Sequence, residues 1–150
     1  MEFDSFDDVI NFAIAREEDA VDAYASMAQK AKNPGLKELL LELEEEEKNH
    51  KRLLQDISQE KIAALTPEKV IDLKISDYLV EEPPSSEMNF QDLLIFAAKK
   101  EQKAVELYGR IADSTDDVDL KKLFLFLVEQ EKAHKFKLEV KYEEHVLEED

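Results

Sequence analysis

The sequence predicts an all-α fold: a four-helix bundle built from two repeated helical hairpins that are joined by a long crossover. Three observations lead to this prediction. The 150 residues include only 2 Gly and 4 Pro beside many Leu, Ala, Glu and Lys, and such a mixture favours long helices over strands. Hydrophobic side chains recur at steps of three and four residues. The chain also repeats itself after 84 residues.

The internal repeat has no gap. Residues 5–54 align with residues 89–138, and 20 of the 50 aligned positions are identical. Because a repeat of this kind describes one structural unit used twice, each half is predicted to fold as the same helical hairpin.

The first hairpin is expected to have helices over 5–31 and 35–58. Ser5, followed three residues later by Asp8, is typical of a helix start, where a side-chain oxygen accepts a backbone N–H. The sequence Asn33-Pro34-Gly35 ends the first helix and begins the second, because proline and glycine interrupt helices.

The second hairpin is expected to have helices over 89–112 and 118–145. Asn89 with Asp92 repeats the start signal of the first hairpin. Residues 114–117, which are Ser, Thr and two Asp, supply the turn and the cap of the last helix.

The length suits one domain with a sizeable core. We expect a single domain over 1–150, with repeat halves 5–58 and 89–145 and a connector at 59–88. About 30 residues can span the length of such a bundle, so the connector permits a long crossover. A helix start at Thr66-Pro67-Glu68 is expected within it.

The apolar stripe of every long helix is interrupted at mid-length by an acid, and in the second and fourth helices also by a histidine. In the second helix the stripe reaches Glu47 and His50 before it resumes at Leu54. Glu47 is therefore predicted to point inward, whereas the acids at 44–46 are predicted to be solvated. The inward-facing polar residues of the whole chain are Glu17, Glu47, His50, Glu101, Glu131 and His134.

These six residues are expected to share one level. At a rise of 1.5 Å per residue, all lie about 20–25 Å from the turn of their hairpin. Packing the two hairpins together would place four carboxylates in one layer of a dry core, where they repel one another. Two divalent cations would neutralise them. Carboxylate and imidazole ligands suit iron or manganese, and also zinc. A salt-bridged layer without metal remains an alternative.

The motifs EKNH (Glu47 to His50) and EKAH (Glu131 to His134), with Glu17 and Glu101, resemble the di-iron centre of rubrerythrins in the ferritin-like superfamily. This resemblance implies a ferritin-like bundle with two metal ions, preferably iron. Rubrerythrins usually also carry a Cys-rich rubredoxin domain, and many have a further Glu one turn after the ligand of the third helix, which is Glu101 here. Here Cys is absent and Ala104 occupies that position. The resemblance therefore implies a more symmetric ligand set, closer to a bacterioferritin-type centre, and an external electron donor such as a rubredoxin.

The resemblance also implies a function, the reduction of hydrogen peroxide or dioxygen by a di-iron oxidoreductase. Two alternatives remain: a ferroxidase that handles iron, and a non-catalytic module that keeps the metal for stability. Tyr24 and Tyr108 follow Glu17 and Glu101 by two helical turns. They are expected either as core aromatics or as hydrogen-bond partners of ligand carboxylates.

Charge and composition exclude several other classes. A net charge of -17 argues against nucleic acids and against anionic membranes as partners. The absence of Cys excludes disulfides and thiolate sites. Since no apolar run could span a bilayer and no secretory signal is visible, a cytoplasmic location is expected. A homodimer is expected from the resemblance.

Overall fold

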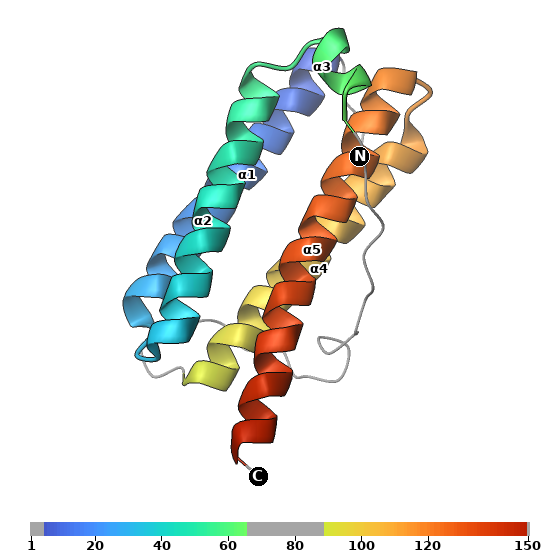
Figure 1. Ribbon diagram of the computed structural model, residues 1–150. Coiled ribbons are helices and arrows are strands. Elements are labelled where there is room, and N and C mark those ends of the chain that lie inside the picture. The colour runs from blue at the N-terminus through green and yellow to red at the C-terminus, as the bar shows by residue number, and fades with distance from the viewer. Residues whose placement is uncertain (1–4, 66–88, 150) are drawn as a thin grey trace. The chain divides into compact units, whose positions relative to one another are not determined.

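The computed structural model describes residues 5–65 and 89–149. Within these residues all regular secondary structure is helical, with four long helices, one short helix and no strand. The chain divides into two compact units, Met1–Ala63 and Ala64–Asp150. The described part of each unit contains one helical hairpin (Figure 1).

The first unit pairs α1 (Phe6–Lys30) with α2 (Pro34–Gln55). The two helices lie side by side and run antiparallel, joined by a short turn (Figure 1). At the start of α1 the Ser5 Oγ accepts from the backbone N–H of Asp8 at 3.2 Å. At the start of α2 the Asn33 Oδ1 accepts from the N–H of Leu36 at 3.0 Å. These caps use N–H groups that lack a partner within the helix, as the sequence predicted.

The end of the second helix differs from the prediction. We expected it at residue 58, but α2 ends at Gln55 and a separate short helix, α3 (Gln59–Ala63), follows. The Ser58 Oγ accepts from the N–H of Lys61 at 3.3 Å, so the serine begins a new helix instead of ending the old one. The rest of the predicted connector, including the expected helix start at 66–68, lies outside the described residues.

The second unit pairs α4 (Phe90–Ser114) with α5 (Val118–Glu149). Asn89 and Asp92 form a reciprocal cap, in which each side chain accepts from the other residue's N–H at 2.9 and 3.4 Å. Asp117 Oδ1 accepts from two N–H groups at the start of α5. The last helix continues four residues beyond its predicted end at 145.

Each hairpin buries most of the predicted stripe. In α5, for example, Leu123, Phe124 and Leu127 have no exposed surface. Phe6 follows the same spacing of apolar residues in α1, but it is 38% exposed because it occupies the first turn of that helix.

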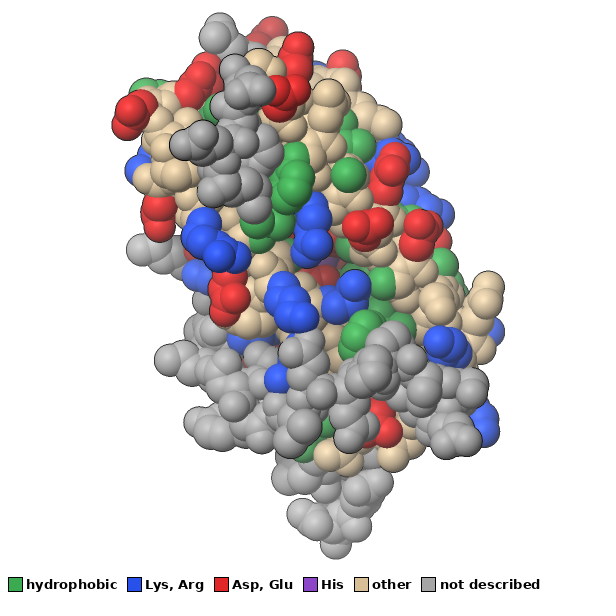
Figure 2. Space-filling model, turned by 180° about the vertical axis from the view of Figure 1, so that it is seen from behind, with side chains coloured by type: hydrophobic (Ala, Val, Ile, Leu, Met, Phe, Trp, Pro, Cys, Tyr) green, Lys and Arg blue, Asp and Glu red, His purple; other side chains and the backbone are tan. Residues whose placement is uncertain are grey.

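The surface is charged. On the face that Figure 2 shows, both acidic and basic side chains are visible, and no histidine surface is visible among the coloured residues. Among the described residues, no helix is both long enough and apolar enough to cross a membrane.

Candidate metal centre

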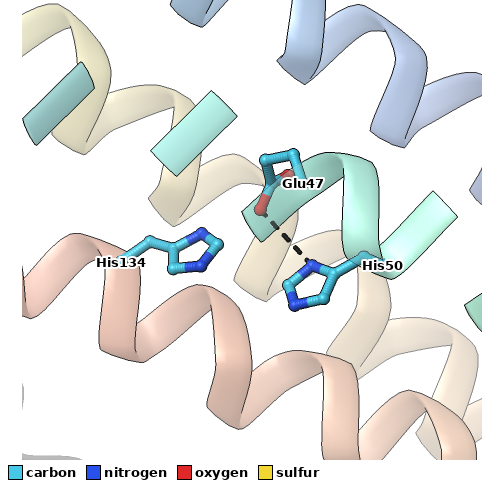
Figure 3. A group of neighbouring side chains, drawn as sticks. All are labelled: Glu47, His50 and His134. Atoms are coloured by element: carbon cyan, nitrogen blue, oxygen red, sulfur yellow. Dashed lines mark ion pairs between the residues drawn. The ribbon is translucent and has the colours of Figure 1, made fainter. Parts of the chain in front are cut away.

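The first unit brings together three of the predicted residues. Glu17 lies on α1, and Glu47 and His50 lie one turn apart on α2. His50 Nδ1 is 3.7 Å from Glu17 Oε2 and 3.4 Å from Glu47 Oε1. Figure 3 shows Glu47 and His50 on α2 with this second ion pair as a dashed line. Within this hairpin, Glu17, Glu47 and His50 therefore lie at the same level along the helix axes, as the rise per residue predicted.

The second unit repeats the arrangement. Glu101 lies on α4, and Glu131 and His134 lie on α5. His134 Nδ1 is 3.8 Å from Glu101 Oε1 and 3.8 Å from Glu131 Oε2. The structure thus contains two Glu–Glu–His triplets, one in each hairpin, and we use the word triplet for these sets below.

All six side chains of the triplets are buried, and none is more than 6% exposed. One carboxylate oxygen of every Glu and the Nδ1 atom of both histidines are shielded from solvent. Burying a carboxylate is costly unless a partner compensates its charge. Such burial, repeated at equivalent positions of both units, indicates that each triplet is kept for a purpose other than core stability.

In the first triplet, the surroundings of Glu17 favour the protonated form of its carboxyl. The pKa of this carboxyl is raised from 4.5 to about 8, chiefly by burial; His50 opposes the rise, and the neighbouring Glu47 contributes to it. In the absence of metal, Glu17 is therefore largely protonated at neutral pH. A bound cation would reverse this preference, because metal ligands must be deprotonated.

The donor atoms of the triplets fit divalent metal ions of the iron group. Carboxylate oxygen and imidazole nitrogen are the donors that iron, manganese and zinc accept. Each of the six side chains offers a ligand atom to a group that could hold a metal ion. A Glu and a His three residues apart lie on the same helix face, so both can reach one ion.

The other predicted residues are placed as follows. Tyr24 and Tyr108 are buried, at 2% and 1% exposure, and the ring of Tyr108 contacts Phe124 at a centroid distance of 5.5 Å. A hydrogen bond from either tyrosine to a ligand carboxylate stays a prediction. Among the acids expected to be solvated, Glu45 is exposed, but Glu44 and Glu46 are half-buried.

The structure also shows a buried polar group that the sequence interpretation missed. Lys135 and Glu139 on α5 are 2% and 1% exposed, and Lys135 Nζ donates to Gln102 Oε1 on α4 at 2.8 Å. A helical face that contains Glu131 continues at steps of four to Lys135 and Glu139. This spacing of four residues could have identified Lys135 and Glu139 as buried. The apolar stripe alone could not, because neither residue is apolar.

Comparisons with known proteins identify one family. The chain matches the family Rubrerythrin over residues 8–142, a range that contains both triplets. Searches of curated proteins and of solved structures gave no significant match. The all-α, ferritin-like fold class is confirmed, and the buried glutamates and histidines fit a di-metal carboxylate protein. Since the match covers most of the chain, this protein belongs to the rubrerythrin family.

Proposed function

We propose that the protein is a di-iron oxidoreductase that reduces hydrogen peroxide with electrons from an external donor. The observation that carries this proposal is the buried Glu–Glu–His triplet, which occurs once in each unit. Membership of the rubrerythrin family supports it.

The ligand count supports one shared centre instead of two separate sites. A single triplet offers three side chains, whereas iron-group ions usually take about four to six ligands. If the two units pack as one domain over 1–150, the layer holds four carboxylates, whose charge balances two divalent cations. We propose that the metal ligands are Glu17, Glu47, His50, Glu101, Glu131 and His134.

The chain's own residues prepare this centre in three ways. Each histidine stands one turn from a glutamate of its own helix, which directs both side chains to one ion. Glu17, protonated without metal, releases its proton when a cation binds. The burial of all six side chains keeps bulk water from the ligand atoms. When bound, two ferrous ions supply the two electrons that, with two protons, convert one hydrogen peroxide into two water molecules.

The electrons must be replaced from outside the 150 residues. These residues contain no Cys, so no thiolate-bound iron among them can relay electrons. A small redox protein such as a rubredoxin is the donor that family membership favours. The same reasoning favours a homodimer, and hydrogen bonds from Tyr24 and Tyr108 to ligand carboxylates.

The test is stopped-flow mixing of anaerobic, Fe(II)-loaded protein with hydrogen peroxide or with dioxygen at equal concentration, followed by ferric absorbance. We expect faster oxidation by peroxide. Glu17→Ala and Glu101→Ala should abolish the signal, whereas Glu45→Ala, on the exposed side of α2, should preserve it.

Other results would redirect the assignment. Faster oxidation by dioxygen, with ferric product that later leaves the protein, would indicate a ferroxidase. A metal-loaded protein that reacts with neither oxidant would indicate a module in which the metal serves stability alone.

A further inference from the structure

A buried lysine connects the two helices of the second unit beside its triplet. Lys135 Nζ on α5 donates to Gln102 Oε1 on α4 at 2.8 Å, and Glu139 Oε2 lies 4.0 Å from the same nitrogen. Lys135 directly follows the predicted ligand His134, and Gln102 directly follows the predicted ligand Glu101. The hydrogen bond therefore links α4 to α5 at the level of the triplet. We call Gln102, Lys135 and Glu139 the lysine clamp.

The first unit has the same lysine at the equivalent position, but in a different setting. Lys51 Nζ lies 2.9 Å from Glu18 Oε1, and the two side chains are 32% and 50% exposed. Both residues, with Gln55, line an open hollow of about 400 Å³. The acid and the amide have thus exchanged helices between the two repeats. The lysine that is buried in one unit is open to water in the other.

This difference in burial changes how firmly each pair of helices is held. An exposed ion pair is weakened by water and by salt, and it restrains its helices little. A buried ammonium must keep its hydrogen-bond partners, because leaving them would strand a charge in a medium of low polarity. We therefore expect the α4–α5 pair to be held in register more firmly than the α1–α2 pair before any metal binds.

We propose that the lysine clamp positions Glu101 and His134, so that the metal position to which these two residues contribute binds its ion more tightly than the metal position to which Glu17 and His50 contribute. This proposal rests on the proposed two-metal function and adds that the two metal positions are unequal. Lys135 and Gln102 are positioning residues here, since they act through their neighbours. Residues that orient metal ligands typically change metal affinity by about 10–100-fold.

The experiment is a titration of metal-free protein with Co²⁺, followed by calorimetry and by the visible absorbance of the bound ion. Wild-type protein should bind two Co²⁺ in two resolved steps. Lys135→Met should weaken the first step by about 10–100-fold and alter the spectrum of the first ion. Lys51→Met, the matched control in the other repeat, should change either step by less than about twofold.

A second pair of variants separates positioning from a general loss of structure. Gln102→Leu removes the acceptor and should also weaken the first step. Gln102→Glu keeps an acceptor, as Glu18 does in the first unit, and should not weaken it. Circular dichroism of each metal-free variant verifies that the helices persist.

Three results would overturn the proposal. Two equal binding steps would show equivalent positions, and equal effects of Lys135→Met and Lys51→Met would show that burial of the lysine is irrelevant. Both results would leave the di-metal function intact. A complete failure to bind Co²⁺, in contrast, would refute the two-metal function itself and the clamp with it.

Discussion

The raised pKa of Glu17 predicts how the stability of the metal-free protein changes with pH. The folded protein holds a proton on Glu17 up to about pH 8, whereas the unfolded chain releases it near 4.5. Between these values the folded state binds more protons, so the free energy of unfolding must fall as the pH rises. At 1.36 kcal/mol per pH unit, the loss across this window is at most about 5 kcal/mol.

Glu17→Gln isolates this contribution, since glutamine has the shape of the protonated acid but does not ionise. The variant should gain stability relative to wild type as the pH rises, with most of the change between pH 5 and pH 8. The assay is urea unfolding of chelator-treated protein at several pH values, followed by helical circular dichroism. The difference between the two proteins in free energy of unfolding, taken at each pH, removes the repulsion among the other charges, because both proteins share it.

Glu45→Gln is the matched control, because the Glu45 side chain is 59% exposed and its ionisation should cost the fold little. The free energy of unfolding of this variant should change with pH in parallel with that of wild type. If Glu17→Gln also runs parallel to wild type, Glu17 is ionised in the folded protein, and the electrostatic description of the first triplet is wrong.

Three further predictions concern the metal and the assembly. Protein loaded anaerobically with Fe(II) should hold about two ions per chain by elemental analysis; Glu47→Ala should lower this number, and Glu45→Ala should not. Chelation should lower the melting temperature measured by calorimetry, because an ion that binds only the native state stabilises it; an unchanged value would contradict a metal site coupled to the fold. Light scattering should give the mass of a dimer, whereas a large closed shell would favour iron storage.

The sequence was sufficient to predict the hairpins and the composition of each triplet. The reason is geometric, since a helix of 3.6 residues per turn places Glu47 and His50 on the face defined by Leu43 and Leu54. Helix starts could also be predicted, as the caps at Ser5 and Asn89 show, because a cap depends on neighbours three residues away.

Helix ends were harder to predict, for a physical reason. The stretch after Gln55 contains no Gly or Pro before residue 67, so local signals allow α2 to continue to residue 58. It ends earlier because Ser58 caps α3 instead. The choice between one continuous helix and two shorter ones depends on packing, which propensity does not describe.

Lys51 and Lys135 occupy equivalent positions of the repeat, and they show why the burial of a side chain could not be predicted from periodicity. Lys51 and Lys135 both directly follow a predicted histidine ligand, so periodicity places them identically. One lies at the surface beside an acid, and the other is buried beside an amide. A lysine can extend its ammonium group to water from many backbone positions. Whether it does so depends on what covers it, which is a tertiary property. A sequence repeat therefore predicts that its two halves have the same ligand residues, but it does not predict that these residues have the same surroundings. The residues that surround the ligands adjust the affinity of a metal site.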